Sequence, residues 1–126
     1  MRTYVDSDVL IWHLRGEARA RDFLRELDAS GAELWTGVLQ RAEILFFMRQ
    51  KEEDDTIRLL SRFRTAPLTV DIVDEAGVLY RKWNPSHGVD VNDAILAATA
   101  MKTGGRILTL NRKHYPMPDL VVIKAW

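Results

Sequence analysis

The sequence predicts an α/β fold in which helices cover both faces of a parallel sheet of about four to five strands, a three-layer α/β/α arrangement. Two observations predict this fold class. Short apolar stretches typical of strands alternate along the chain with longer stretches whose apolar residues recur at helical spacing. In addition, 126 residues with a hydrophobic content of 47% suffice for one domain with a buried core, residues 1–126.

The first half of the chain contains two predicted strands and four predicted helices. Ser7 is in position to cap the first helix, and Gly16 and Gly31 follow the first two helices as C-terminal stops. The acidic run 51–55 reads as a turn between the third and fourth helices. The expected strands span residues 2–5 and 33–36, and the expected helices span residues 8–15, 17–30, 38–50 and 55–64.

The second half contains two predicted helices and up to three predicted strands. Pro67 ends the preceding helix. Residues 84–88 contain asparagine, proline and glycine, so we expect a loop there. The expected helices span residues 71–83 and 90–102, and the expected strands span residues 68–70, 106–110 and 120–123.

The stretch Asp90–Lys102 is the centre of this organisation. It is apolar nearly all round, which places the helix inside the domain and leaves polar roles to its ends. Asp90 suits the N-cap and Asp93 the third helical position, a capping arrangement that needs no catalytic explanation. Asp93 also lies at the positive end of the helix dipole, where a site carboxylate is stabilised.

Composition excludes several classes of function. There are no cysteines, so the chain forms no disulfides, thiolate metal sites or cysteine nucleophiles, in keeping with a reducing cytoplasm. The N-terminus does not read as a signal peptide, and no apolar run approaches the roughly 20 residues of a membrane span. Eighteen basic residues balance 18 acidic ones, so bulk charge does not predict nucleic-acid binding.

Four polar residues from four segments point to one edge of the sheet. Asp6 and Asn111 follow predicted strands, at the carboxyl ends where ligands bind in open parallel sheets. Glu43 and Asp93 lie on helices that begin at the same edge. Clustered carboxylates repel unless a cation balances them, and Mg²⁺ or Mn²⁺ prefers such oxygen ligands.

Each of these residues also has a structural explanation. Asp6 and Asn111 are common turn or cap residues. Glu43 projects from an otherwise apolar helix, so it is either buried and paired, or it reaches solvent or pairs with an arginine such as Arg41. The three histidines lack zinc-ligand spacing, although His114 lies where it can touch a substrate. No nucleophile elbow and no P-loop is present.

Taken together, four pieces of the chain resemble the PIN-domain family, and specifically the VapC-like toxins of bacterial and archaeal toxin–antitoxin pairs. The pieces are YVDSDVLIWHLRG, AEIL around Glu43, NDAILAATA around Asp93 and GGRILTLNRKHYPM, in the family's order and spacing. The resemblance covers essentially the whole chain. It implies a parallel sheet flanked by helices and a Mg²⁺- or Mn²⁺-dependent endoribonuclease.

The resemblance assigns roles to individual residues. Asp6, Glu43 and Asp93 correspond to the metal-binding acids, and Asn111 falls where many PIN domains have a fourth acid. Asn111 removes one negative charge, so occupancy of a second metal site is open, and Asp90 either compensates or only caps its helix. Thr109 corresponds to a residue that can hold a water or a phosphate.

The implied mechanism is attack of a metal-activated water on an RNA phosphodiester. Arg15, Arg112 and Lys113 are candidates for contacts with the RNA backbone, although each is equally an ordinary surface charge. The family further implies a cognate antitoxin and a homodimer. Apolar residues of the early helices, Trp12, Leu24 and Leu27, serve either these interfaces or the core.

Other functions remain open at this point. A PIN domain can act in DNA or RNA processing instead of as a toxin. A catalytically degenerate PIN fold would act as a binding module, although that reading predicts lost acids and three are present. A metal-dependent phosphatase is a more distant alternative.

Overall fold

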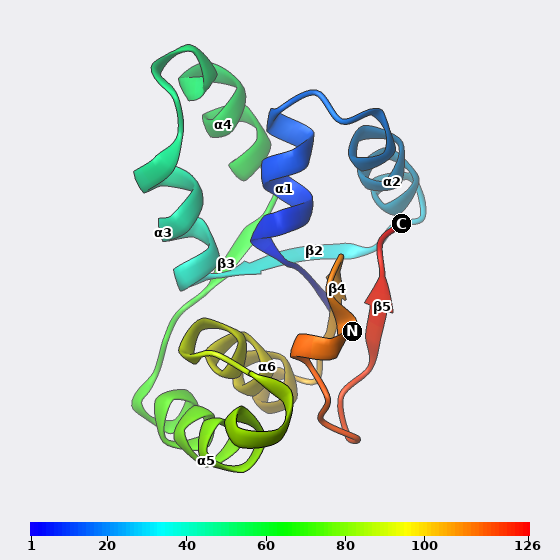
Figure 1. Ribbon diagram of the computed structural model, residues 1–126. Coiled ribbons are helices and arrows are strands. Elements are labelled where there is room, and N and C mark those ends of the chain that lie inside the picture. The colour runs from blue at the N-terminus through cyan, green and yellow to red at the C-terminus, as the bar shows by residue number, and fades with distance from the viewer.

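The computed structural model describes residues 1–126 as a five-stranded parallel sheet between two layers of helices (Figure 1). The strand order is β3-β2-β1-β4-β5, so β1 lies in the middle and pairs with β2 on one side and β4 on the other. The strands are β1 (Arg2–Val5), β2 (Glu33–Gly37), β3 (Arg64–Ala66), β4 (Arg106–Thr109) and β5 (Val122–Lys124). The helices are α1 (Ser7–Leu14), α2 (Ala18–Ala29), α3 (Val38–Phe47), α4 (Glu53–Leu60), α5 (Val70–His87) and α6 (Val91–Thr103), with short 3-10 turns η1 (Gln50–Glu52) and η2 (Arg112–His114).

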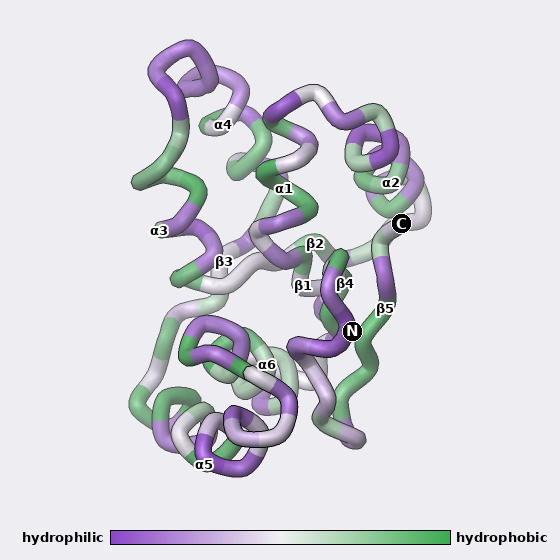
Figure 2. Tube along the Cα trace, in the orientation of Figure 1, coloured by the Kyte–Doolittle hydropathy of each residue, from purple (hydrophilic) through white to green (hydrophobic).

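Each face of the sheet has its own apolar core. Tyr4 and Ile107 pack with α5 and α6, whereas the next residues, Val5 and Leu108, pack with α1 to α4. This alternation is the period of two that a strand buried on both faces requires. Figure 2 shows hydrophilic stretches along the outer helices α2, α4 and α5. Each fully buried aliphatic side chain contributes about 1.5–3 kcal/mol to folding.

Close packing explains one glycine at the edge of α6. A Cβ at Gly105 would lie 2.6 Å from a ring carbon of Tyr4, closer than real contacts allow. Gly105 therefore lets the chain leave α6 directly against the first strand. Gly104, just before it, ends α6 in the left-handed conformation with φ 71°.

The fold class and most expected elements are confirmed, but four local predictions are wrong. Asp6, not Ser7, caps α1, because its side chain accepts from the Ser7 N–H at 2.8 Å. The acidic run 51–55 is not a turn, because it forms part of η1 and the start of α4. Acidic side chains stabilise the N-terminus of a helix. The helix expected over 38–50 consequently ends at Phe47.

The other two errors concern α5 and β3. Residues 68–70 are not a strand; the strand precedes Pro67, and Thr69 caps α5 by accepting from the Ile72 N–H at 3.2 Å. Residues 84–87 are helical despite Pro85, because a proline in the last turn removes only one hydrogen bond. Asn84 stabilises this end by donating to the Val89 carbonyl at 3.0 Å. The last strand begins at Val122, two residues later than expected.

No helix is both long enough and apolar enough to cross a membrane.

Candidate active site

A cavity of about 250 Å³ opens where the carboxyl ends of β1 and β4 meet the N-termini of α1 and α6. None of the side chains that line it is hydrophobic. All four residues that the sequence predicted to meet lie in this lining. The lining consists of Asp6, Ser7, Asp8, Gln40, Glu43, Asp90, Asn92, Asp93, Asn111 and His114.

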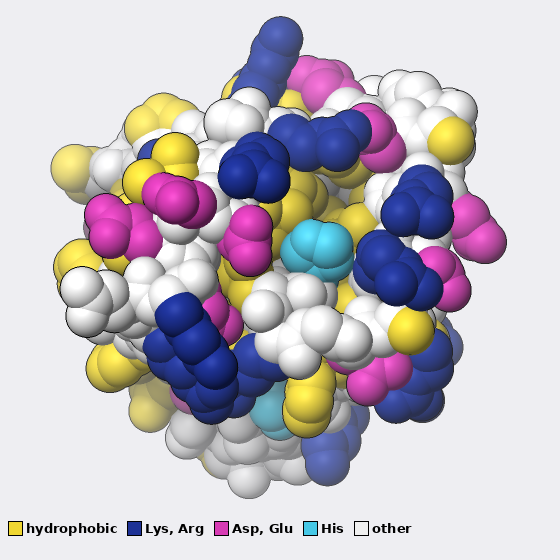
Figure 3. Space-filling model, turned by 90° about the horizontal axis from the view of Figure 1, so that it is seen from above, with side chains coloured by type: hydrophobic (Ala, Val, Ile, Leu, Met, Phe, Trp, Pro, Cys, Tyr) yellow, Lys and Arg dark blue, Asp and Glu magenta, His cyan; other side chains and the backbone are white.

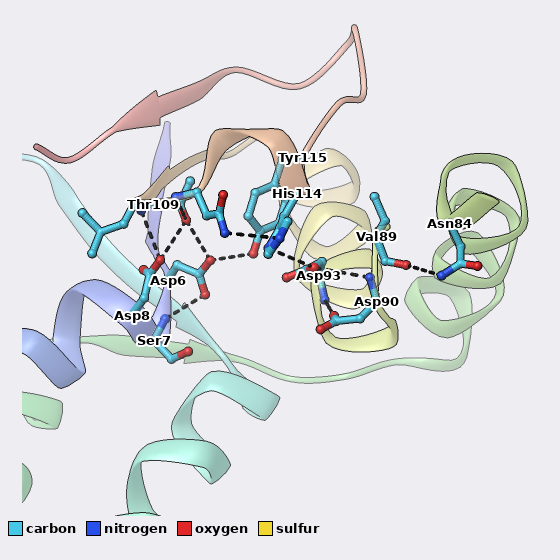
Figure 4. Close-up of polar contacts among 12 residues, drawn as sticks. Asp6, Ser7, Asp8, Asn84, Val89, Asp90, Asp93, Thr109, His114 and Tyr115 are labelled. Atoms are coloured by element: carbon cyan, nitrogen blue, oxygen red, sulfur yellow. Dashed lines mark hydrogen bonds and ion pairs between the residues drawn. The ribbon is translucent and has the colours of Figure 1, made fainter. Parts of the chain in front are cut away.

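Asp6 is half-buried and lies at the centre of a hydrogen-bond network (Figure 4). Its Oδ2 accepts from the Tyr115 hydroxyl at 2.7 Å and from the Thr109 hydroxyl at 3.0 Å, and its Oδ1 accepts from the Ser7 N–H. Burial raises the pKa of Asp6 above 3.8, these hydrogen bonds oppose the rise, and the charge of Glu43 adds to it. Oδ2 thus has two donors and Oδ1 one, which leaves Oδ1 one free lone pair.

Asp93 and Asp90 form the capping box of α6. The Asp90 carboxylate accepts from the Asp93 N–H at 2.7 Å, and the Asp93 carboxylate accepts from the Asp90 N–H at 3.3 Å. Burial raises the pKa of Asp93 to about 7, and the charges of Asp90 and Asp6 contribute. The capping explanation and the site explanation are therefore compatible, because the same carboxylate caps α6 and lines the cavity.

Glu43 reaches the cavity from α3. The Ser7 hydroxyl donates a hydrogen bond to its Oε2, so Glu43 neither points into solvent nor pairs with Arg41. Arg41 instead donates to the Thr65 hydroxyl at 3.4 Å. Beyond Glu43 on α3, Ile44 belongs to the core, whereas Phe46 and Phe47 do not, since they are 78% and 76% exposed.

Asn111 and His114 connect to Asp93 from η2. The Asn111 Nδ2 lies 3.2 Å from His114 Nε2, and the opposite ring nitrogen lies 3.6 Å from the Asp93 carboxylate. An amide NH₂ can only donate, so Nε2 accepts from Asn111 and the ring N–H is on Nδ1, facing Asp93. In this arrangement Asn111 orients His114, a contact that the residue types alone did not indicate.

Sequence reasoning missed two further residues at the cavity. Asp8 accepts from the Leu110 N–H at 3.2 Å and from the Thr109 hydroxyl at 3.3 Å. Burial raises its pKa to about 6, and the charge of Asp6 adds to the shift. Gln40 is 3% exposed and its Oε1 has no partner. A Cβ at residue 37 would collide with this oxygen, so Gly37 makes room for Gln40.

The spacing of these residues held a usable signal. Asp8 comes two residues after Asp6, and Gln40 comes one helical turn before Glu43, so both share an element with a predicted acid. Tyr115 left no such signal, because a tyrosine after a loop reads as a packing residue.

The expected substrate residues differ in position. Arg112 and Lys113 are exposed on η2, next to Asn111, and Arg15 follows α1 and lines a small groove with Glu43. Thr109 is fully buried, and its hydroxyl donates to the acids and accepts from the Asn111 N–H. A direct contact of Thr109 with substrate is therefore unsupported, and the residue orients Asp6 instead.

The side chains fit a hard divalent cation in their chemistry. Carboxylate and amide oxygens dominate the lining, and no sulfur is present. The raised pKa values of Asp6, Asp8 and Asp93 mark buried carboxylates that lack a compensating charge. No three acidic or histidine side chains converge on a single point, because each acid is held by hydrogen bonds within the protein.

Comparisons with known proteins identify the family of this chain. The family model for the PIN domain matches residues 3–120. Ribonuclease VapC10 of Mycobacterium tuberculosis is 41% identical over 114 residues, which cover 90% of this chain and 85% of that protein. Ribonuclease VapC19 of the same species is 36% identical over 118 residues, covering 92% and 94%.

Solved structures share the fold. VapBC2 from Rickettsia felis, bound to a promoter DNA fragment, matches with a TM-score of 0.82 at 16% identity, covering 100% of this chain and 99% of that chain. A toxin–antitoxin complex from Klebsiella pneumoniae matches with a TM-score of 0.80 at 21% identity, covering 98% of each chain. With the family match over most of the chain and two relatives above 30% identity, this protein belongs to the PIN-domain family and, within it, to the VapC group.

Proposed function

We propose that this protein is a metal-dependent endoribonuclease, with Asp6, Glu43 and Asp93 as the metal-binding acids, and that it acts as the toxin of a toxin–antitoxin pair in the cytoplasm. The observation that carries the proposal is the cavity in which these three acids, from β1, α3 and α6, meet without a hydrophobic side chain. The similarity to two ribonucleases named VapC supports the substrate class.

Asp6, Glu43 and Asp93 would hold Mg²⁺ or Mn²⁺, with Asn111 as a possible further ligand. The ion would supply charge neutralisation of the phosphate and a coordinated water of lowered pKa. Around it, Tyr115 and Thr109 fix the Asp6 carboxylate, and Ser7 fixes Glu43. Such outer contacts orient ligands and tune their affinity.

The remaining side chains of the cavity would act on the RNA. His114, oriented by Asn111, presents an N–H beside Asp93 at the rim. Arg15, Arg112 and Lys113 are exposed near this rim and would contact backbone phosphates. We further propose a cognate antitoxin and a homodimer as partners, by analogy with the complexes whose fold this chain shares.

The test is cleavage of total RNA by purified protein with Mg²⁺ or Mn²⁺, compared with Asp93→Asn and with an EDTA control. Asparagine keeps an oxygen that accepts the Asp90 N–H, so the capping box survives while the charge is lost. We expect cleavage to fall at least about 100-fold in the variant and to vanish with EDTA.

Asp119→Asn, at an exposed loop position, is the matched control and should cleave like the wild type. Equal cleavage by wild type and Asp93→Asn would contradict the proposal. RNA binding without cleavage, across substrates and metals, would replace it with the binding-module function.

A further inference from the structure

A second hollow lies at the opposite end of α1 from the acidic cavity. Two adjoining cavities, of about 230 and 330 Å³, lie between α1, α2 and α4 and share His13, Leu59 and Arg62. Figure 3 looks onto this side and shows a histidine in a depression, with basic and acidic side chains around it. We call the two cavities together the basic hollow. Its charged lining consists of His13, Arg21, Arg25, Asp28, Asp55, Arg58 and Arg62.

Positive charge is concentrated there although the whole chain is neutral. Four arginines face two aspartates in the lining, against a net charge of zero for the protein. Arg21 and Arg25 are four residues apart on α2, where like charges repel. Arg25 has no ion pair, and the pairs of Arg21, Arg58 and Arg62 with acids are more than half exposed on the arginine side. Such an arrangement is stabilised when an anion enters.

His13 is the second unusual feature of the basic hollow. Its Nδ1 is buried and has no hydrogen-bond partner, a state that costs about 1–3 kcal/mol. Burial lowers its pKa, and the nearby charge of Arg21 lowers it further, whereas Asp55 raises it. His13 therefore adds an unsatisfied polar atom to the wall of the hollow, and the arginines supply the donors for an anion.

The placement of the donors favours phosphate over carboxylate. Arg21 and Arg25 project from α2, while Arg58 lies on α4 and Arg62 just beyond it, so donors approach from two facing elements. A carboxylate is satisfied in one plane by a single arginine fork, whereas a phosphate presents oxygens in several directions. Leu24, Leu34, Leu59 and Phe63 form an apolar floor that keeps these interactions partly out of water.

We propose that the basic hollow is a phosphate-binding subsite for the RNA backbone, remote from the phosphate that is cleaved. The eight residues of α1 separate it from the acidic cavity by about 12 Å, a distance that a few nucleotides span. Arg15, just after α1, lines a groove that also includes Glu43 of the acidic cavity. This inference rests on the proposed function, because it takes RNA as the ligand.

The test measures RNA affinity without cleavage. A single-stranded RNA of about 20 nucleotides is titrated in EDTA with wild type and with the double variant Arg25→Ala/Arg58→Ala, at several salt concentrations. The matched control is Arg19→Ala/Arg81→Ala, which removes the same charge from exposed sites outside the hollow. We expect the hollow variant to bind about tenfold more weakly and its log–log salt slope to fall by about 0.7–1.4, one or two phosphates. The control should change neither value by as much.

A second measurement separates this inference from the proposed function. Cleavage of a short RNA that reaches only the acidic cavity should have the same kcat/KM in wild type and hollow variant. If the hollow variant cleaves RNA and its RNA affinity and salt slope equal those of wild type, the subsite proposal is overturned and the nuclease proposal stands. Weakened binding in a protein that cleaves nothing would support the subsite and refute the nuclease. Lost binding of an acidic peptide, with RNA affinity unchanged, would assign the hollow to a protein partner and overturn the proposal.

Discussion

Asp6 shows how strongly neighbouring side chains determine what one carboxylate can do. Its Oδ2 is occupied by the hydroxyls of Tyr115 and Thr109, so its orientation is fixed before any ligand binds. Tyr115 is itself buried, and burial together with the charge of Asp6 raises its pKa well above 10.0. The phenol therefore stays protonated and remains a hydrogen-bond donor to Asp6 throughout the usual pH range.

Removing this donor tests its role. We expect Tyr115→Phe to weaken Mg²⁺ affinity and to lower kcat/KM, each by about 10-fold, because an outer contact of a metal-binding acid is lost. Calorimetric titration with Mg²⁺ and a cleavage assay measure the two effects. Tyr80→Phe, at a half-buried position with no side-chain hydrogen bond, serves as the control. An unchanged metal affinity in Tyr115→Phe would refute the positioning role.

Asn111 makes a sharper prediction, because its two explanations differ in sign. If Asn111 is a metal ligand, substitution by Asp should make the site bind the metal more tightly. If Asn111 instead orients His114 by donating a hydrogen bond, the substitution should remove this contact, since a carboxylate cannot donate to Nε2. We expect Asn111→Asp to lower kcat/KM about 3–10-fold at pH 8. In the presence of His114→Ala the same substitution should have little effect, as a double-mutant cycle would reveal. Higher activity in Asn111→Asp would establish the ligand role instead.

At the residue scale, the sequence predicted which acidic residues line the cavity but not how their side chains are oriented. The sequence identified three carboxylates as cavity residues: Asp6 after a strand, Asp93 at the start of a helix and Glu43 within an otherwise apolar helix. The hydrogen bonds from Tyr115 and Ser7 depend on how separate segments approach, which no local pattern contains. Asp8 was overlooked because any aspartate early in a helix has a sufficient explanation as a cap.

Among the elements, α6 couples folding to the site through its capping box. Asp90→Ala removes the acceptor of the Asp93 N–H and should cost about 1 kcal/mol, measured by urea unfolding. Asp90→Ser keeps a capping oxygen and should cost much less. Thr69→Ala is the matched control, because it removes the equivalent cap of α5, far from the acids. We expect similar destabilisation in both alanine variants, but lower cleavage activity only in Asp90→Ala.

A loss of activity in Thr69→Ala as large as in Asp90→Ala would mean that stability alone explains the effect.

Element prediction succeeded where a single signal dominated, as with Gly104 at the end of α6. It failed where two signals competed. Pro85 argued for a loop, yet tertiary packing carries α5 through it to Gly88, and the acidic run before α4 reads equally as a turn or as a helix start.

For the whole molecule, the buried acids impose a pH dependence on stability. The pKa of Asp8 is about 6 and that of Asp93 about 7 in the folded chain, against 3.8 when unperturbed. The folded state therefore holds protons that the unfolded state has already released. Consequently the free energy of unfolding of the metal-free protein falls as pH rises from about 4 to about 7, and levels off above that range.

Thermal unfolding in EDTA measures this dependence. We expect metal-free Asp93→Asn to be more stable than wild type at pH 8 by about 1–2 kcal/mol, after allowance for solvent screening, and its Tm to be roughly 5 °C higher. The difference should disappear near pH 4. Added Mg²⁺ should raise the Tm of wild type but not of the variant. A variant less stable than wild type at pH 8 would show that Asp93 is held mainly by favourable contacts.

The whole-molecule arrangement was predictable only in outline. Alternating elements indicate a parallel sheet with helices on both faces, but not the order β3-β2-β1-β4-β5. That order depends on which strand of the second half pairs with β1, a choice made by packing of α6 beneath the sheet. The adjacency of Asp6 and Thr109 follows from that pairing alone.

The same adjacency has a consequence for how the protein is made. The residues that hold Asp6, Thr109 and Tyr115, are synthesised 103 and 109 residues after it. A ribosome translating this message therefore carries an incomplete centre until the last part of the chain emerges. A chain that stops before β4 lacks both hydroxyls that orient Asp6.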